Sequence, residues 1–288
     1  MADSILVVGG TGMLGKPVVK RLTLDGHRVR VVTRQPDRAR SALGDDVEVV
    51  SGDIDDPESI VRALDGCVGV HINLDGHGDW DLERRGAACV ADAAAKGRVS
   101  RVTLISGASA CEQNASFPMT RAKLDAERAV AASGVPYTVF RCTMFMEVLP
   151  NYVKDGKVLL MGDQPYPWHW VAADDYARMV SLAHRTPAAA GKILHVRGPD
   201  ALTFEQALER FRVQCLGGAP LQRFPFWLLG LVSLFPSRRE LRKVGLPVMR
   251  YFARVTEVGD PTEANTLLGA PTTTLEQWCS TYPKPLSR

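Results

Sequence analysis

An apolar run near the start of the chain leads directly into a glycine-rich turn, and a helical pattern follows at once. Three of the glycines, Gly10, Gly12 and Gly15, have the spacing G-x-G-x-x-G of a dinucleotide-binding βαβ unit. In such a unit the first glycine permits a tight turn, the second lets the backbone approach a pyrophosphate, and the third lets the helix pack closely on the strand.

The position of this turn, between a strand pattern and a helix pattern, favours a nucleotide site over a turn of similar shape that holds no ligand. The helix would present unpaired N–H groups and the positive end of its dipole to the phosphates. We expect the cofactor contacts of this turn to be Gly9, Gly10, Thr11, Gly12, Met13, Leu14 and Gly15.

Runs of β-branched residues alternate with helical patterns over the first 140 residues, as a doubly wound parallel sheet requires. Strands are predicted near 4–9, 28–33, 47–51, 68–73, 101–106 and 136–141. Helices are predicted near 13–25, 36–43, 57–64, 80–96 and 119–133.

The regular alternation of strand and helix patterns ends after Pro150, and from Leu202 onward the chain is predicted to be mostly helical. We therefore predict an α/β protein with a Rossmann-type doubly wound parallel sheet and a small, mostly helical C-terminal substrate lobe. The dinucleotide-binding core is expected to span 1–150, with 173–198 returning to it. The smaller substrate or partner lobe is expected to comprise 151–172 and 199–288.

Composition argues against several classes of protein. A formal net charge of +3 over 288 residues is too small to indicate nucleic acid, and the six histidines show no metal-ligand spacing. The six cysteines are scattered without a C-x-x-C pair, which argues against disulfides or structural zinc and is typical of a reducing compartment. We therefore expect a cytoplasmic protein without a metal, and no leader segment, because the first strand pattern begins near Ser4.

The end of the second predicted strand indicates which dinucleotide binds. NAD sites of this type place a carboxylate about 20 residues after the glycines, where it binds the ribose 2′-hydroxyl. Thr33 and Arg34 occupy that position here, and Arg38 follows one helical turn later. Because a guanidinium suits a 2′-phosphate, the sequence favours NADP(H) over NAD(H). The alternative for Arg34 is an ordinary exposed arginine.

Two further strand ends carry candidate cofactor contacts. Asp53 and Ile54 close the third predicted strand, where the carboxylate could accept a hydrogen bond from the adenine amino group while Ile54 packs on the ring. Asn73 ends the fourth predicted strand, near the expected cofactor ribose. The alternative for Asp53 is a helix cap, since aspartate at a strand end also caps helices.

An apolar stretch adjoins a basic one in the C-terminal part of the chain. Residues 224–235 are almost all apolar, and 238–254 carry six cations against Glu240 alone. The apolar stretch is too short to cross a bilayer, which takes about 20 residues. One interpretation is that the apolar stretch forms a buried helix or a pocket wall and that the basic stretch is a solvated face. The alternative is that 224–254 contacts a protein or a membrane surface.

These features together resemble the atypical short-chain dehydrogenases/reductases, in particular the NmrA-like group. Besides the glycine motif and 52–54, the resemblance rests on 133–141 (SGVPYTVFR), 170–175 (WVAADD) and 267–273 (LLGAPTT), and it covers almost the whole chain. The group includes reductases, redox-sensing regulators without catalysis, and assembly factors or accessory subunits of electron-transfer complexes.

Most short-chain reductases carry Tyr-x-x-x-Lys. The tyrosine protonates the substrate carbonyl, and the lysine lowers the tyrosine pKa and holds the nicotinamide ribose. This chain keeps Lys123 but has Met119 in the tyrosine position, and a thioether cannot donate a proton. The resemblance implies that Lys123 contacts the cofactor or is itself the proton donor; otherwise it is a surface lysine.

Three alternatives to a lysine acid remain open. Ser106 or Ser109, at the end of the fifth predicted strand, could relay a proton through water. Hydride transfer to a quinone or flavin needs no tyrosine-like acid. A protein that binds NADP(H) without turnover needs no acid at all.

A second departure from the family pattern follows the sixth predicted strand, where Cys142 replaces the usual proline after Arg141, at the turn beside the nicotinamide. We expect Cys142 to lie at the cofactor as a small buried residue rather than as a nucleophile, because no histidine partner is evident nearby in the sequence. An apolar pocket or ordinary core would include Phe145, Met146, Tyr152 and Trp168.

The leading hypothesis is an NADP(H)-dependent oxidoreductase that acts on a small hydrophobic or aromatic substrate such as a quinone, an enone or a carbonyl compound. The alternative is a non-catalytic NADP(H)-binding redox sensor or assembly protein. We expect a monomer or a homodimer.

Overall fold

The computed structural model describes residues 3–76, 78–97 and 99–283, which form two compact units. The first unit contains the described residues up to Cys142, together with Ala173–Val196 and Gly259–Ala270. The second contains Thr143–Ala172, Arg197–Val258 and the described residues from Pro271 onward.

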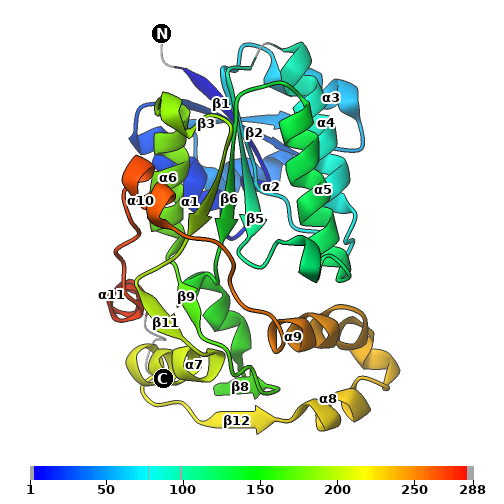
Figure 1. The fold of residues 1–288 in the computed structure, drawn as a ribbon, viewed down its shortest axis with the longest axis vertical. Helices are drawn as coiled ribbons and strands as arrows, with labels where there is room; N and C mark the ends of the chain where they lie inside the picture. Colours follow the sequence, from blue (N-terminus) through cyan, green and yellow to red (C-terminus); the bar gives the residue numbers. More distant parts are fainter. Residues whose placement is uncertain (1–2, 77, 98, 284–288) are drawn as a thin grey trace. The chain divides into compact units, whose positions relative to one another are not determined.

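A seven-stranded parallel sheet forms the centre of the first unit, with the order β10-β6-β5-β4-β1-β2-β3 (Figure 1). Its strands are β1 Ser4–Val8, β2 Arg28–Thr33, β3 Val47–Ser51, β4 Gly69–Ile72, β5 Arg101–Gly107, β6 Tyr137–Cys142 and β10 Lys192–Val196. From β1 the chain builds β2 and β3 on one side and the remaining strands on the other. Ligands of open α/β sheets bind at the carboxyl ends of the strands beside such a reversal.

The central strand β1 has the sequence of a strand that is buried on both faces. Ile5, Leu6, Val7 and Val8 are each at most 2% exposed, and an unbroken apolar run is typical of the middle of a parallel sheet. β1 pairs with both β2 and β4, and the strand ends just before Gly9. The glycine turn therefore starts at the carboxyl edge of the sheet.

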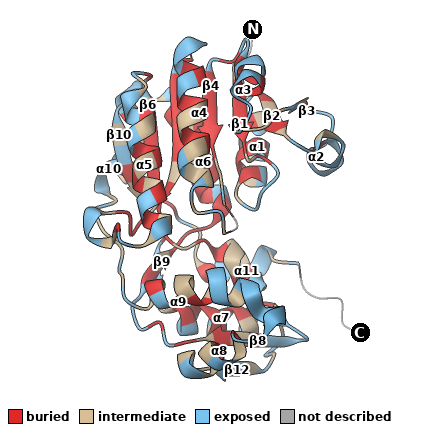
Figure 2. Cartoon of the chain, turned by 90° about the vertical axis from the view of Figure 1, so that its right-hand side faces the viewer, coloured by how far each residue is buried: buried red, intermediate tan, exposed pale blue. Residues whose placement is uncertain are grey.

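Helices cover both faces of this sheet (Figure 1). On one face α3, α4 and α5 pack side by side, and on the other α1 packs against α6. The helices of this unit are α1 Gly15–Leu24, α2 Pro36–Leu43, α3 Pro57–Leu64, α4 Leu82–Lys96, α5 Pro118–Ala132, α6 Ala173–Arg185 and α10 Thr262–Leu268, with short 3-10 turns at Glu112–Asn114 and Pro187–Ala189. Figure 2 shows the buried strands and inward helix faces against exposed outer faces. The predicted Rossmann-type α/β fold is confirmed.

The helix α10 comes back to the sheet from the last third of the chain. From the sequence we expect it in the smaller lobe, but it packs against β10 and α6 in the first unit. Arg178 of α6 donates to the carbonyls of Leu268, Gly269 and Ala270, and Lys192 of β10 pairs with Glu263 at 2.7 Å. These contacts fix the helix and the turn that follows it.

The second unit combines short strands with helices. β7 Val153–Lys154, β8 Lys157–Met161 and β12 Leu221–Phe224 form one small sheet, and β9 Trp168–Trp170 pairs with β11 Asp200–Leu202. The helices are α7 Phe204–Cys215, α8 Phe226–Val232, α9 Leu246–Phe252 and α11 Leu275–Thr281, with 3-10 turns at Met146–Tyr152 and Pro236–Arg238 and a π-helical turn at Leu241–Gly245.

The core of the second unit is rich in aromatic rings. Phe204 lies at the centre, with its ring 5.0 Å from that of Trp170 and 5.2 Å from that of Tyr152. Met146 is fully buried in the same cluster, and Trp168 packs edge-on against Phe252. Met146, Tyr152 and Trp168, which were candidates for a pocket or for ordinary core, thus pack in the core of this unit.

No described helix is long and apolar enough to cross a membrane.

Candidate functional site

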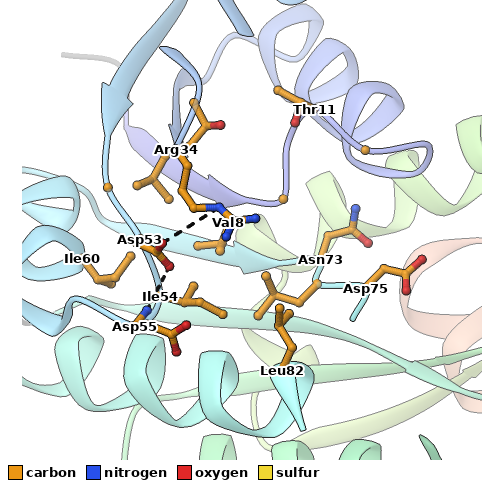
Figure 3. A pocket seen from close by; sticks show the side chains of 16 residues that line it. Val8, Thr11, Arg34, Asp53, Ile54, Asp55, Ile60, Asn73, Asp75 and Leu82 are labelled. Carbon is orange, nitrogen blue, oxygen red and sulfur yellow. Dashed lines mark hydrogen bonds and ion pairs between the residues drawn. The ribbon is translucent and has the colours of Figure 1, made fainter. Parts of the chain in front are cut away.

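A cavity of about 280 Å³ opens at the carboxyl ends of β1, β2, β3 and β4, as Figure 3 shows. Because parallel strands end at one edge of a sheet, residues far apart in the sequence meet here. Its lining includes, from the four strand ends, Val8, Gly9, Thr11, Gly12, Thr33, Arg34, Asp53, Ile54, Asp55, Asn73, Leu74 and Asp75, with Leu82 from α4.

The glycine turn is packed so tightly that side chains are excluded at two of its positions. Gly9 has a φ of +83°, and a Cβ there would lie 1.9 Å from the Asn73 carbonyl oxygen. A Cβ on Gly15 would lie 2.1 Å from the Gly9 carbonyl oxygen. The left-handed residue of the turn is thus Gly9, whereas we expect from the sequence that Gly10 makes the turn. Gly10 instead packs against Val31.

The start of α1 is open to an anion. Thr11, Gly12 and Met13 are exposed, and a Cβ on Gly12 would meet only the Gly9 carbonyl oxygen, at 3.3 Å. No side chain caps the helix at Leu14, and its first turn holds no acidic residue. The N–H groups and the positive dipole end therefore face an open position suited to phosphate.

Arg34 lies at the end of β2, with its side chain 75% exposed at the mouth of the cavity. Its Nε atom is 3.9 Å from an Asp53 carboxylate oxygen (Figure 3), a long pairing between exposed groups that contributes little to stability. The guanidinium therefore remains available for a phosphate. Arg38 lies one helical turn further on and donates to the Gln35 side chain.

Asp53, Ile54 and Asn73 line the same cavity (Figure 3). The Asp53 carboxylate accepts from the N–H of Asp55 at 3.1 Å, which holds its orientation. Ile54 and Leu74 pack against α4, where a Cβ on Gly86 would lie 2.9 Å and 2.3 Å from their methyl carbons. The predicted adenine contacts thus form a cleft with a polar rim and an apolar wall.

Lys123 forms a largely buried ion pair with Glu83. The two side chains are 18% and 16% exposed, and Nζ lies 2.6 Å from Oε2. Burial is the strongest single influence on the pKa of Lys123 and lowers it, but the charge of Glu83 and its hydrogen bond outweigh burial and leave the pKa raised. The charge of Asp75 adds to this increase. Lys123 is therefore an ammonium ion whose position is fixed by its ion pair with Glu83.

The hydroxyl of Ser106 takes part in a buried network. It donates to Glu127 Oε1 at 2.5 Å, and Arg141 donates to both oxygens of the same carboxylate, at 3.0 and 2.6 Å. Glu127 is 5% exposed, so its charge needs these partners. In this arrangement the Ser106 hydroxyl is engaged between β5 and α5. Ser109 is also buried.

Cys142 ends β6 in the neighbourhood of Lys123. Burial raises the pKa of its thiol, and the charge of Lys123 lowers it without offsetting that increase. A buried thiol of this kind stays protonated and is a poor nucleophile. Met119 lies one helical turn before Lys123 on α5, half-buried.

Sequence reasoning missed Glu83 and Asp75. Glu83 lies in the first turn of α4, which neighbours α5, so the adjacency of those two predicted helices would have been the signal. Asp75 lies two residues beyond Asn73 and lines the cavity. The described residues contain no cluster of three or more His, Cys, Asp or Glu suited to a metal.

Comparison with known families agrees with this geometry. A family model described as NAD(P)H-binding matches residues 9–177, which begin at the glycine turn and include the ends of β2, β3 and β4. The chain belongs to this NAD(P)H-binding family, among the atypical short-chain dehydrogenases/reductases.

Relatives in this family have different roles. The (4-alkanoyl-5-oxo-2,5-dihydrofuran-3-yl)methyl phosphate reductase of Streptomyces griseus is 34% identical over 224 residues, covering 76% of this chain and 75% of the relative. The photosystem II assembly factor Ycf39 of Trieres chinensis is 24% identical, covering 80% and 75%. The crystal structure of Citrobacter sp. triphenylmethane reductase with NADP(H) has the same fold, with a TM-score of 0.77 at 19% identity, covering 96% and 100%.

Proposed function

We propose that this protein is an NADP(H)-dependent oxidoreductase that acts on a small hydrophobic or aromatic substrate, such as a quinone, an enone or a carbonyl compound. The observation that supports it best is the exposed Arg34 guanidinium at the end of β2, beside a cavity that begins at the glycine turn. A 2′-phosphate provides the charge and oxygen geometry that a guanidinium binds.

The residues at the strand ends fit an NADP(H) molecule. The glycine turn and the open start of α1 suit the pyrophosphate, since a Cβ would collide with the backbone at Gly9 and Gly15 but not at Gly12. Asp53 and Ile54 would hold the adenine, and Asn73 the ribose. When bound, NADPH supplies a hydride; the protein's own part is to bind, orient and protonate.

Lys123 is the residue best placed to hold or deliver a proton. Its pKa is raised and Glu83 keeps the ammonium in one position, so the charge persists at neutral pH. Such a group can bind the nicotinamide ribose or stabilise negative charge developing on a substrate oxygen. The Cys142 thiol stays protonated and takes no proton from the substrate. Cys142 is proposed only to border the cofactor.

Ser106 is a weaker candidate for the proton donor than Lys123. Its proton is donated to Glu127, so a relay through Ser106 would require that bond to break. Ser109 remains as the other serine of this strand end.

Substrate class is proposed from the most similar reductase named above. The name of that relative describes an oxo-dihydrofuran that carries an alkanoyl group and a methyl phosphate, in which the ring C=C bond is conjugated with carbonyl groups. An enone therefore heads the set of test substrates, followed by quinones and aldehydes.

The experiment is an assay of NADPH oxidation by the purified protein with these substrates. We expect turnover of at least one enone or quinone, its loss in Gly12→Trp, and a strongly reduced rate in Lys123→Ala. Turnover that survives Lys123→Ala would remove the lysine from the chemistry while leaving the enzyme assignment intact.

A second candidate function is an NADP(H)-binding module without turnover, which senses redox state or helps to assemble a complex. Met119 in the tyrosine position and the engaged Ser106 hydroxyl favour it, because both reduce the number of proton donors. Tight NADPH binding without oxidation of NADPH by any of these substrates would support this candidate over the first.

A further inference from the structure

The helix α8 and the turn after it expose four large apolar side chains. Trp227, Leu231, Leu234 and Phe235 are 67%, 55%, 65% and 65% exposed, respectively. The spacing of these residues, hereafter the apolar stripe, places them on one side of a helical turn pattern. Apolar residues in this number and order on a surface mark a binding face.

The opposite side of α8 is already packed. Leu229 is 5% exposed, and Phe226 fills the space beside Gly162, where a Cβ would lie 2.1 Å from the phenyl ring. Leu229 and Val232 also form a wall of a cavity of about 390 Å³ that β8 and β12 line from the other side. The helix is thus held by its inner face, while more than half of each side chain in the apolar stripe stays exposed.

Six cations follow the apolar stripe in the sequence, and one of them, Arg250, lies against α8 in the fold. They are all exposed, and none forms an ion pair with a described residue: Arg238, Arg239, Arg242, Lys243, Arg250 and Arg254. Arg250 of α9 places a guanidinium nitrogen 3.7 Å from the position of a Cβ on Gly230 of α8. The two helices are in contact in the second unit.

The segment 238–254 concentrates positive charge. Other exposed arginines, such as Arg84 and Arg128, pair with neighbouring carboxylates. Between 238 and 254 the one acid is Glu240, so the segment stays strongly positive. A second copy of the same surface would bring like charges together, which opposes self-association through this face.

We propose that this face binds the surface of an anionic phospholipid bilayer, with the apolar stripe in the interfacial layer and the six cations against lipid phosphates. Trp, Phe and Leu on one side with Arg and Lys beside them are the composition of helices that lie in a membrane interface. Each cation near an anionic surface adds attraction, and the aromatic rings settle at the headgroup level.

The cavity beneath α8 extends the same chemistry inward. Its charged lining residues are three cations, Lys154, Lys157 and Arg238, and one acid, Asp155, while neighbouring residues such as Leu159 contribute apolar surface. A lipid phosphate at this opening would meet positive charge next to an apolar wall. Membrane attachment would bring the protein to apolar substrates such as quinones, but this inference does not depend on turnover.

The test is flotation of the full chain with vesicles of phosphatidylcholine alone and of phosphatidylcholine mixed with phosphatidylglycerol. We expect binding to the mixed vesicles, weak binding to the neutral ones, and release by high salt. Trp227 is exposed whereas the other four tryptophans are buried or half-buried, so the fluorescence should shift to the blue on binding.

Variants separate the two parts of the surface. Trp227→Ser with Leu231→Ser should lower partitioning about tenfold or more, and Arg242→Ser with Lys243→Ser by about an order of magnitude. The matched controls are Val213→Ser, a 54% exposed apolar residue of α7, and Arg84→Ser. Circular dichroism would establish that each variant is folded.

Three results would overturn the proposal. One is no binding of the wild-type chain to the mixed vesicles. Another is equal loss of binding in the control variants. The third is a homodimer in sedimentation velocity that the Trp227→Ser, Leu231→Ser variant dissociates, because this face would then be a subunit interface.

Discussion

The Nζ atom of Lys123 lies 2.6 Å from Oε2 of Glu83, in a pair whose side chains are less than one-fifth exposed. The two residues belong to adjacent helices, α5 and α4, and each stands near the start of its helix. This contact links the packing of the sheet's covering helices to the one basic group retained from the Tyr-x-x-x-Lys pattern.

Glu83→Gln should lower both the stability of the protein and the pKa of Lys123. The amide keeps a hydrogen bond but removes the charge, so we expect a loss of about 1–3 kcal/mol in the free energy of unfolding at neutral pH. Since the pKa of Lys123 is raised in the folded state, this stabilisation is complete below the unfolded pKa of about 10.4 and is lost as pH rises through the folded value.

Urea unfolding measures this effect, and the exposed pair Lys192–Glu263 provides its control. That pair has a similar distance, 2.7 Å, but its side chains are 42% and 51% exposed. Glu263→Gln should therefore cost no more than about 1 kcal/mol. Equal losses in the two variants would contradict the importance given to burial. If turnover is found, its alkaline limit should move to lower pH in Glu83→Gln.

Two glycines of the turn should respond differently to the same substitution. Gly15→Ala places a methyl group 2.1 Å from the Gly9 carbonyl oxygen, so we expect a loss of about 1–3 kcal/mol in stability. Gly12→Ala meets the same oxygen at 3.3 Å and should remain within about 0.5 kcal/mol of wild type. Gly12→Ala should still weaken NADPH binding, because the added methyl keeps the phosphates from the backbone.

Urea unfolding and calorimetric titration with NADPH together measure these two effects. A Gly12→Ala protein that binds NADPH like wild type would place the phosphates elsewhere than at the exposed side of this turn.

Stability should fall as the pH is lowered through the range of an ordinary histidine. His71 is fully buried between β1 and β5, bonded to Thr103 at 2.9 Å, and burial lowers its pKa to about 3. Burial also lowers the pKa of His184, and the charge of the nearby Arg101 adds to this decrease. Between about pH 6.5 and these folded values the unfolded chain binds more protons, so acid favours unfolding.

Each of the two histidines should contribute a slope approaching about 1.4 kcal/mol per pH unit below pH 6.5. The measurement is urea unfolding at a series of pH values above the carboxylate range. His71→Gln should reduce the slope, whatever its stability at neutral pH. An unchanged slope in His71→Gln would show that His71 takes up its proton at the same pH in the folded and unfolded chains.

The strand ends could be predicted from the sequence because a parallel sheet brings them to one edge. Arg34 and Asn73 directly follow β2 and β4, and Asp53 follows β3 after Gly52, so their meeting in one cavity needs no knowledge of side-chain packing. The role of each glycine could not be predicted in the same way. The collision of Gly9 with Asn73 depends on how closely β4 approaches the turn.

Partners on different elements were also beyond prediction. Glu83 is 40 residues from Lys123, and Glu127 is 21 residues from Ser106. Periodicity indicates that such residues face the interior but not which side chains meet. Likewise, the pattern of a seven-residue helix such as α10 would be the same whichever unit the helix packed on. The exposure of Trp227 depends on which neighbours α8 packs against.

The most direct test of the account is calorimetric titration of wild type and Arg34→Ser with NADPH and with NADH. We predict that wild type binds NADPH more tightly and that Arg34→Ser weakens NADPH binding about 10- to 100-fold, as expected for loss of a charged hydrogen-bonding partner, while NADH binding is unchanged. Arg28→Ser, at the opposite end of β2, should match wild type. Equal affinity of wild type for the two cofactors, or equal weakening of both by Arg34→Ser, would contradict the account.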